Sequence, residues 1–537
     1  MKTKKLISVL LLLVMVCTLT TGCGTNGTGG GTAKGGKLKV GIPQKVSVSD
    51  YEDNAYTNYI EENTGVEIEF VYFSSTASEY KQQLALMASS NEAFPDVIMG
   101  FNGLGTRSVN QYGEDGYFLD LTDLIEKHGD SFQEQYNNLA EKVKELVDLR
   151  MTSPDDGCIY GMPLVTQVLI DNIQSLCFIN QTWLDKVGMA VPTTVDELYN
   201  VLKAFATKDP NGNGIADELP MLGGDDIINY VLNAYTYYEQ AHPWNIENGS
   251  IYAPFITDEY REAVRTMNKL CKEGLFSDLS FTVTSNTELK NLYTPASGTA
   301  TVGVICGHPS TKTNTTSAIL DEYVALPPLS AATEKGGYLV VSEDTVSIGT
   351  FITKDCKDPE LAMEFIDFFY EDETVRRGRH GERDVDWEEG TGMDIYGNEV
   401  STVVVNEQAF FDGNQTWCVN VCGIHTPLNY NSISAENNDA GARVATLLAG
   451  SYNLIGEYPM KEETVRNLEY TTEEDDIKEQ YESTITNYVK EKTKLFIMGT
   501  MDINSDSDWN SFVSQIKELN LDGVLGIKQS AYDRANK

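Results

Sequence analysis

Alternating and helical patterns follow one another in the first hundred residues. Stretches such as KLKVGI and VEIEFVYF alternate apolar and polar side chains, which predicts strands, and apolar residues at helical spacing lie between them. Strands are therefore expected at 37–42, 66–73 and 95–99, and helices at 51–63 and 78–90. This order is typical of a parallel sheet flanked by helices. Because such sheets bind ligands beyond the carboxyl ends of their strands, residues 100–107 are expected to border a site.

The same two periodicities continue to the end of the chain. Further strands are predicted at 175–179, 298–306 and 347–352, and further helices at 192–207, 260–273, 359–370, 477–496 and 509–519. Thr194 and Glu197 have the spacing of a capping box, which favours a helix that begins there. The chain is therefore predicted to be α/β throughout, with a helical C-terminal part.

The first residues have the pattern of an export signal. A basic start is followed by the apolar run Leu6–Val16, which as a helix rises only about 16 Å, too short for a membrane core of about 30 Å. Small residues before Cys23 resemble the bacterial lipobox, which implies that residues 1–22 are removed as a signal peptide and that Cys23 carries lipid. An ordinary secretion signal with a chance cysteine is the alternative. The glycine-rich residues 23–36 then form a flexible tether.

Composition excludes some partners. The 537 residues are 41% hydrophobic, as in folded proteins, and the length allows about three or four domains. Lys and Arg number 40 against 80 Asp and Glu, so the net charge is −40. Such a chain is repelled by phosphate backbones and by anionic bilayers, so no nucleic-acid partner is expected.

The nine cysteines predict no complete disulfide framework. Two of them belong to the signal and the anchor, and the remaining seven are an odd number. Cys418, Cys422 and His425 lie close in sequence and could hold a metal. Buried thiols, or one local disulfide, are the favoured interpretation of these residues.

A loop after the 192–207 helix has calcium-binding spacing. Asp209, Asn211 and Asn213 place oxygens at alternate positions, and Gly214 follows, as in the first half of an EF-hand loop. The carbonyl of Ile215 and the carboxylates of Asp217 and Glu218 would complete the shell. Pro220 occupies position 12, so a paired EF-hand is disfavoured. Hard oxygens suit Ca²⁺, and a structural ion is expected; an Asp/Asn/Gly turn without metal is the alternative.

Several segments, in order along residues 37–534, resemble one known family. They are PDVI at 95–98, GYFLDLTDL at 116–124, IYGMP at 159–163, WLDKVGMAVPTTVDELYNVLKAF at 183–205, EGLF at 273–276, FIMG at 496–499, Trp509 and AYDR at 531–534. The chain is thereby similar to the family 1 extracellular solute-binding proteins of ABC importers. The lipoprotein branch of Gram-positive bacteria is the nearest match. The loop at 209–218 lies where the related alginate-oligosaccharide-binding proteins carry calcium.

The resemblance implies a two-lobed, periplasmic-binding-protein-like fold that closes over a ligand. Three crossing segments are expected near 165–169, 299–308 and 346–352. The first lobe is then expected to contain 37–165 and 307–346, and the second 166–306 and 347–537.

Candidate ligand residues follow from the chemistry of sugars, which offer apolar faces and hydroxyl groups. Aromatic rings and polar side chains on loops at lobe edges are therefore expected to line the cleft. The candidates are Phe101, Asn102, Gln167, Trp244, His308, Trp387 and Trp417. A core or strand-edge position is the alternative for each of them.

The sequence therefore predicts a lipid-anchored, non-enzymatic monomer outside the cell that hands an oligosaccharide to ABC permease subunits. A secreted glycoside-active enzyme and a ligand-presenting sensor lipoprotein are the alternatives; neither HExxH nor GxSxG occurs in the sequence. The net charge disfavours a polyanionic ligand, although the cluster Arg376, Arg377, Arg379 and Arg383 could reverse this locally.

Overall fold

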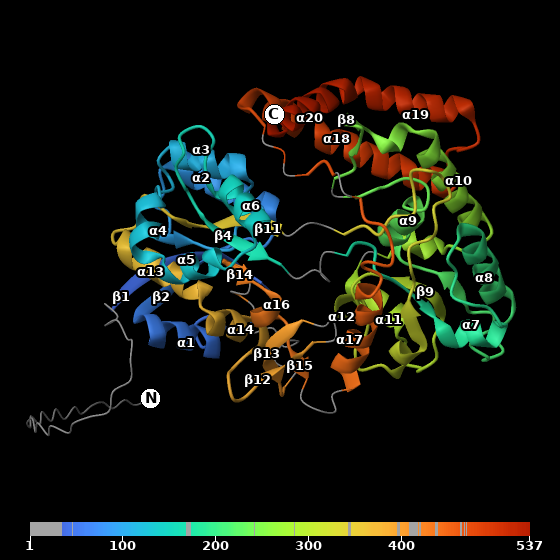
Figure 1. Cartoon of the computed structure of the whole chain (residues 1–537), viewed down its shortest axis with the longest axis horizontal. Helices are drawn as coiled ribbons and strands as arrows, with labels where there is room; N and C mark the ends of the chain where they lie inside the picture. The colour runs from blue at the N-terminus through green and yellow to red at the C-terminus, as the bar shows by residue number, and fades with distance from the viewer. Residues whose placement is uncertain are drawn as a thin grey trace, which may run out of the picture.

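The structure is a computed structural model with two lobes side by side (Figure 1). It describes residues 35–536 except 46, 168–172, 241, 284, 342–344, 395–397, 407–416, 418–419, 435–438, 462–463, 467 and 469. The predicted signal peptide at 1–22, Cys23 and nearly all of the predicted tether lie outside the described residues. In the part of the chain that is described, no helix combines the length and the apolar stretch that a membrane span needs.

The first lobe is built on a six-stranded sheet of order β14-β4-β11-β3-β1-β2. Its strands are β1 (Gly36–Pro43), β2 (Val66–Phe73), β3 (Val97–Ile98), β4 (Met162–Thr166), β11 (Thr345–Ile352) and β14 (Gly423–His425). β1 pairs in parallel with β2 and β3, which confirms the predicted parallel arrangement of the first strands. β11 runs antiparallel to both β3 and β4 in the middle of the sheet.

Helices cover this sheet, and a small sheet lies beside it (Figure 1). The helices are α1 (Ala55–Thr64), α2 (Ala77–Ser90), α3 (Thr106–Glu114), α4 (Thr122–His128), α5 (Asp130–Asn137), α6 (Glu141–Met151), α13 (Pro359–Asp367), η5 (Phe368–Tyr370), α14 (Asp372–His380) and α16 (Pro427–Tyr430). The small sheet has the order β12 (Trp387–Met393), β13 (Glu399–Val404), β15 (Ile433–Ser434).

The second lobe is built on a four-stranded sheet of order β10-β5-β9-β6. Its strands are β5 (Cys177–Asn180), β6 (Leu219–Met221), β9 (Val302–Cys306) and β10 (Tyr323–Ala325), and β7 (Asn245–Glu247) pairs separately with β8 (Ser250–Tyr252). The helices are α7 (Gln181–Val187), α8 (Val195–Thr207), α9 (Gly224–Leu232), η2 (Pro254–Ile256), α10 (Asp258–Lys272), η3 (Asp278–Phe281), α11 (Asn286–Tyr293), α12 (Pro309–Lys312), η4 (Ala318–Glu322), α17 (Asp439–Tyr452), α18 (Thr472–Ile497), α19 (Asp506–Glu518) and α20 (Leu521–Ala535).

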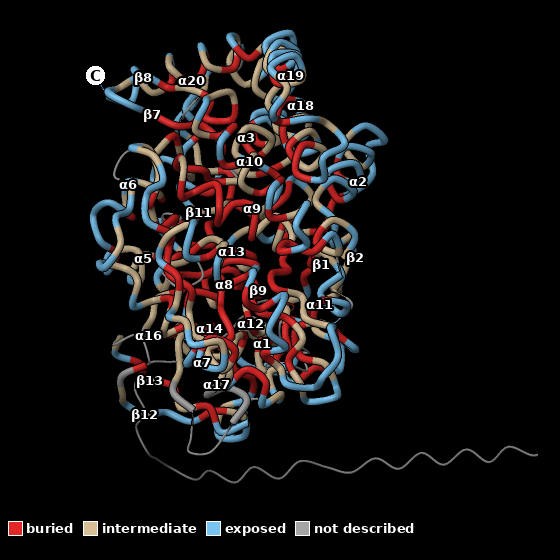
Figure 2. Tube along the Cα trace, turned by 90° about the vertical axis from the view of Figure 1, so that its right-hand side faces the viewer, coloured by how far each residue is buried: buried red, intermediate tan, exposed pale blue. Residues whose placement is uncertain are grey.

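Each lobe has its own hydrophobic core. Buried segments run through the interior, whereas exposed positions gather on outer helices such as α2 and α19 (Figure 2). The capping box is present at the start of α8: the Glu197 N–H donates to the Thr194 hydroxyl at 3.1 Å, and the Thr194 N–H donates to the Glu197 carboxylate at 3.2 Å. The helix then runs to Thr207, as its sequence predicts.

The predicted division between the lobes was wrong in two segments. Residues 307–346 were assigned to the first lobe, but β10 pairs with β5 in the second sheet. Residues 347–537 were assigned to the second lobe, but β11 and β14 complete the first sheet, whereas the part from α17 onward packs on the second core. Periodicity identifies a strand but carries no information about which sheet the strand joins.

The chain passes between the lobes three times. The passages lie between β4 and β5, between β10 and β11, and between β15 and α17. The first agrees with the crossing predicted at 165–169. The crossing predicted at 299–308 was wrong, because β9 lies inside the second sheet between β5 and β6. The second passage ends before the crossing predicted at 346–352, because these residues already belong to β11 of the first sheet.

A disulfide joins two strands of the second sheet. Cys177 on β5 faces Cys306 on β9 in the antiparallel register, and their sulfurs are bonded. The sequence predicted no such pair, because the two cysteines are 129 residues apart. Cys158, Cys271, Cys356 and Cys422 are free thiols, and Cys418 lies outside the described residues. A structural disulfide is typical of a protein that folds in an oxidising compartment.

A buried ion pair fixes two of the interlobe connections to the second lobe. The side chains of Arg466 and Glu239 are 7% and 2% exposed, and their closest N–O distance is 2.5 Å. Arg466 also donates to the carbonyl of Val341, and Glu239 accepts from the amide of Gln174 at 3.0 Å. Gln174 follows the first passage and Val341 precedes the second. The pair therefore anchors both connections at the same place.

Arg466→Met is expected to destabilise the second lobe, because it leaves the Glu239 carboxylate buried without its cation. The free energy of unfolding should fall by about 3–5 kcal/mol in chemical denaturation. As a control, Lys127→Met breaks the exposed pair with Asp123 at 3.1 Å and is expected to cost at most about 1 kcal/mol. Equal losses for the two variants would contradict the anchoring role.

Candidate binding cleft

A large hollow lies between the two lobes. It measures about 970 Å³ and is bordered by α3 and α6 of the first lobe and by the beginning of α18 and the end of α20 of the second. Figure 1 shows α3 and α6 on the side of the first lobe that faces α18 and α20. Its charged lining residues are Lys81, Arg107, Glu114, Arg150, Asp155, Glu473, Asp475, Lys478, Glu479 and Arg534, and polar side chains such as Asn110, Gln111 and Thr471 lie between them.

The loop after β3 brings the first lobe to this hollow. Leu104 to Arg107 belong to the lining, so the stretch expected at 100–107 does border a hollow. The sheet topology explains this position: β3 ends at Ile98, and the chain then leaves the sheet at the carboxyl end of the strand.

Arg107 also connects the two lobes directly. Its guanidinium lies 2.6 Å from the Asp476 carboxylate and 3.7 Å from that of Glu479, and both acids belong to α18. The hydrogen bond to Asp476 is the largest cause of a raised Arg107 pKa. The ion pairs therefore span the hollow at one edge and favour the approach of the lobes.

Tyr470 is the aromatic side chain of the lining, among the described residues. The Lys478 ammonium lies 4.6 Å from the centre of its ring, and the Lys528 ammonium lies 5.6 Å away and donates to the Tyr470 hydroxyl at 3.3 Å. Lys528 is buried and paired with Glu482 at 2.8 Å; burial lowers its pKa. The ring is thus held by cations at the edge of the second lobe. Sequence reasoning missed Tyr470.

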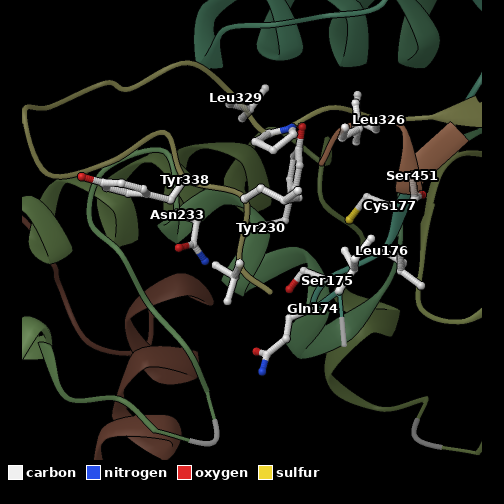
Figure 3. A pocket seen from close by; sticks show the side chains of 15 residues that line it. Gln174, Ser175, Leu176, Cys177, Tyr230, Asn233, Leu326, Leu329, Tyr338 and Ser451 are labelled. Atoms are coloured by element: carbon white, nitrogen blue, oxygen red, sulfur yellow. The ribbon is translucent and has the colours of Figure 1, made fainter. Parts of the chain in front are cut away.

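A second, smaller pocket lies on the second lobe near the passages (Figure 3). It measures about 30 Å³, room for about two water molecules at 10–15 Å³ each. The polar groups of its lining are already used: the Tyr230 hydroxyl donates to the Pro327 carbonyl at 2.6 Å, and the Asn233 amide donates to the carbonyls of Asn229 and Tyr238. It is too small for a sugar ring, whereas the hollow between the lobes, at about 970 Å³, is large enough and is the candidate site.

The four aromatic candidates from the sequence are core residues. Their rings are buried, and none presents a face to a cleft. Phe101 packs on Phe73 and Tyr80, and Trp417 packs on Tyr56, Phe70 and Phe369. Their prediction as ligand platforms is therefore corrected.

The indole nitrogens of the other two are satisfied inside the lobes. Trp387 donates to the Gly381 carbonyl at 3.0 Å, and Trp244 donates to the Glu482 carboxylate at 2.6 Å. The Trp244 ring also lies 5.0 Å from the Lys528 ammonium. Trp244 therefore packs against Lys528, the cation that donates a hydrogen bond to the Tyr470 hydroxyl.

The three polar candidates lie at facing sheet edges. Asn102 follows β3 and Gln167 follows β4, and the two strands run in the same direction because each is antiparallel to β11. Their ends form the edge from which the chain leaves for the second lobe. His308 follows β9, which is antiparallel to β5, so it lies at the edge where the chain enters. All three are half-buried, and their role in ligand binding stays a prediction.

Local contacts hold the side chains of Asn102 and His308. The amide nitrogen of Asn102 donates to the Asn420 carbonyl at 2.6 Å, while its Oδ1 is buried with no partner among the described residues. The His308 Nδ1 lies 2.7 Å from the Ser310 hydroxyl.

The loop at 209–218 folds around its own carboxylates. The Asp209 carboxylate accepts from the N–H groups of Gly212 and Gly214, both of which have positive φ. The Asn211 and Asn213 amides donate to the Asp217 carboxylate at 2.9–3.1 Å. These are the side chains whose spacing predicts a calcium site.

Glu218 closes the loop. Burial raises its pKa, and the negative charges of Asp209 and Asp217 raise it further. Its Oε1 is buried without a hydrogen-bond partner among the described residues.

The alternative metal site at Cys418, Cys422 and His425 receives no support. In the described part of the chain, which leaves out Cys418, no three Asp, Glu, His or Cys side chains are gathered as a formed metal site, the loop at 209–218 included. Cys422 is a buried thiol, and burial lowers the pKa of His425 to about 3, so this imidazole is neutral and part of the core.

The sequence pattern of the bacterial extracellular solute-binding proteins matches residues 46–376, more than half of the chain. The chain belongs to this family. Two lobes joined by three passages, with a polar hollow between them, are the architecture that such proteins need to enclose a solute.

Three curated relatives carry related descriptions. The fructooligosaccharide ABC transporter substrate-binding protein FusA of Streptococcus pneumoniae is 24% identical over 514 residues, which are 92% of this chain and 89% of FusA. The polygalacturonan/rhamnogalacturonan-binding protein YtcQ of Bacillus subtilis is 28% identical over 300 residues, 53% of this chain and 54% of YtcQ. The lipoprotein LipO of B. subtilis is 25% identical over 283 residues, 50% of each chain.

Solved structures share the fold. FusA in complex with kestose has a TM-score of 0.74 at 23% identity and covers 93% of this chain and all of its own. A FusA EF-hand mutant with fructo-nystose has a TM-score of 0.73 at 22% identity, with 93% and 100% covered. The alginate-binding protein AlgQ2 without calcium ion has a TM-score of 0.65 at 22% identity, with 94% and 99% covered. The predicted two-lobed fold is thereby confirmed.

Arg107→Ala is expected to shift this solute-binding protein toward a more open state, because it removes both ion pairs between the lobes. Exposed pairs contribute about 0.2–1 kcal/mol, which corresponds to an increase of up to about fivefold in the ratio of open to closed molecules. Small-angle scattering and the distance between labels on α1 and α8 measure the shift. Lys127→Ala is the control, and an Arg107→Ala distribution identical to the parent's would show that the pairs do not hold the lobes.

Proposed function

We propose that this solute-binding protein is a lipid-anchored, extracellular lipoprotein that captures an oligosaccharide and delivers it to an ABC importer. The observation that carries the proposal is the polar hollow of about 970 Å³ between two lobes that are joined by three passages. Its size is at the upper end of the range of about 300–1,000 Å³ for ligand sites, which suits several sugar units better than one.

The lining chemistry supports a sugar ligand. Asn110, Gln111 and Thr471 supply uncharged donors and acceptors, and the charged side chains supply stronger ones. Tyr470 offers an apolar ring to the C–H face of a sugar. FusA is solved in complex with kestose, and YtcQ is described as a polygalacturonan/rhamnogalacturonan-binding protein, so both relatives take carbohydrates.

Delivery rather than conversion is the proposed role. The family is one of binding proteins, and the lobes can trap a ligand by closing around it. The carboxylates of Glu114 and Asp155 lie in the hollow, but acid pairs are frequent in a chain with 80 acidic residues and do not by themselves make a glycosidase. A sensor that presents the same ligand to a receptor would need the same cleft, and loss of uptake in cells without the permease separates the two roles.

The anchor and the assembly state belong to the proposal as well. Lipid on Cys23, after removal of residues 1–22, would hold the chain at the outer face of the membrane, and residues 23–36 would let it reach the permease subunits. The similarity to LipO supports a lipoprotein. We propose that it acts as a monomer.

Tyr470→Ala is expected to weaken oligosaccharide binding by about tenfold, or about 1.4 kcal/mol, because it removes the ring of the lining. A thermal-shift screen of oligosaccharides identifies the ligand, and calorimetry measures affinities. Tyr470→Phe should retain most of the affinity, and Tyr72→Ala, which removes an exposed ring outside the hollow, should retain all of it. Chromatography of the sugar recovered from the protein tests whether the ligand is bound intact. Recovery of cleaved sugar would contradict the binding role and indicate an enzyme.

The loop at 209–218 is proposed to hold a structural calcium ion. Three carboxylates and two amide oxygens are hard ligands, as Ca²⁺ requires, and a calcium ion would satisfy the buried Oε1 of Glu218. Asp209, Asn211, Asn213, Asp217, Glu218 and the carbonyl of Ile215 would be the ligands. The ion would neutralise the acids that raise the Glu218 pKa. The descriptions of one FusA structure as an EF-hand mutant and of the AlgQ2 structure as lacking calcium ion support this proposal.

Calcium is expected to raise the melting temperature of the parent protein, and EDTA to lower it, because the loop acids repel one another without a cation. Asp209→Ala and Glu218→Gln should each reduce the response to calcium, whereas Asp123→Ala, on the exposed face of α4, should leave it intact. The response should weaken as the pH falls, since protons compete for the Glu218 carboxylate. A parent protein indifferent to EDTA would refute the calcium site.

A further inference from the structure

We infer that the cleft selects neutral oligosaccharides over acidic ones. The inference rests on the proposed function and adds the substrate class, which the relatives leave open. It follows from how the charges of the hollow are arranged, because an acidic sugar needs cations that are available to its carboxylates.

Cations of the second wall are already held by acids of this chain. Arg534 donates to the Glu474 carboxylate at 2.8 Å, and this hydrogen bond is the largest cause that lowers the Glu474 pKa. Lys478 lies 3.2 Å from the Asp475 carboxylate. Glu474 and Asp475 come from the first turn of α18. An incoming carboxylate would have to displace these partners.

The cation that reaches across from the first wall is held in the same way. Arg107 is shared between Asp476 and Glu479 of α18, although neither acid belongs to its own lobe. The lining contains five basic and five acidic side chains, and Asp476 and Glu474 add two acids that hold its arginines. With the basic and acidic side chains of the lining equal in number, the hollow has no excess of positive charge for an acidic ligand, in a chain whose net charge is −40.

The first wall also carries acids that repel one another. Burial raises the Glu114 pKa, and Asp155, Asp156 and Asp115 raise it further. Glu114 and Asp155 both line the hollow. The local field thus favours a proton on a carboxylate, and it would disfavour the charged group of a uronate in the same way.

Neutral sugars avoid this conflict. A hydroxyl group donates to a carboxylate and accepts from a guanidinium, so it can join the existing ion pairs without a net charge. A uronate carboxylate only accepts, and like charges placed together in an interface cost several kcal/mol. Three of the five basic side chains of the lining, Arg107, Lys478 and Arg534, are already paired with acids of this chain, so the hollow favours hydroxyls over carboxylates.

The arginine cluster of Arg376, Arg377, Arg379 and Arg383, on α14 and directly after it, does not reverse this conclusion. Arg377 and Arg383 both pair with Glu373 at 2.9 Å, and Arg383 pairs with Glu389 at 3.1 Å. None of these residues belongs to the lining of the hollow. Their charges are neutralised within the first lobe, away from the cleft.

Calorimetry with length-matched probes tests the inference on the full mature chain. The neutral trisaccharides kestose, maltotriose and xylotriose are compared with trigalacturonate and trimannuronate at low ionic strength. At least one neutral trisaccharide should bind at least about tenfold more tightly than either acidic one. Binding of an acidic trisaccharide with equal or higher affinity overturns the inference but leaves the proposed function intact. Failure of a broad neutral and acidic panel, longer chains included, overturns both.

A charge variant gives an independent readout. Glu114→Gln with Asp155→Asn removes two acids from the first wall, so the ratio of neutral to acidic affinities should fall by at least about threefold. Glu62→Gln with Asp53→Asn removes the same charge from exposed positions at α1, outside the hollow, and should leave the ratio unchanged. A ratio that is the same in parent, variant and control would show that the wall acids do not select the ligand.

Discussion

The whole architecture depends on one pairing, the insertion of β11 between β3 and β4. β11 follows the second lobe in sequence, so the first sheet can be completed only when the chain returns from that lobe. Neither lobe is therefore a continuous segment, and the passages must lie beside one another at the facing sheet edges. The positions of Asn102, Gln167 and His308 at the facing sheet edges follow from this return.

Two interactions secure the second lobe at the same place. The Cys177–Cys306 disulfide joins the strand that receives the first passage to its neighbour β9. The Arg466–Glu239 pair holds Gln174 and Val341, at the ends of two passages. A buried ion pair alone is weak evidence for stability, because desolvation offsets its attraction. Here it also fixes geometry, since both partners bind groups on the passages.

Local elements could be predicted from the sequence because their causes are local. The alternation at 66–73 gives β2 with the same bounds, and the capping box at Thr194 gives the start of α8. The membership of 307–346 could not be predicted, because it depends on pairing of β10 with a strand far away in sequence. Likewise, the cysteine count contains no information about the register that brings Cys177 and Cys306 together.

The site was harder to predict than the fold for a related reason. Trp387 and Trp417 stand in polar stretches, which suggests exposure, but long-range packing buries them. The aromatic residue that does line the hollow, Tyr470, stands directly before α18. Thr471 and Glu474 form a capping box there, so α18 begins five residues before the start predicted at 477. What was not readable is that α18 begins opposite α3 of the other lobe.

The beginning of α18 therefore serves stability and recognition together. Glu473, Glu474 and Asp475 lie in its first turn, where the positive end of the helix dipole favours negative side chains. The same stretch of acids continues to Asp476, which holds Arg107 across the cleft, while Glu474 holds Arg534. Acids that stabilise the helix thus neutralise the arginines of the cleft. A mutation that freed these arginines for an acidic sugar would have to remove carboxylates that stabilise α18, so the charge balance of the cleft is tied to the stability of the fold.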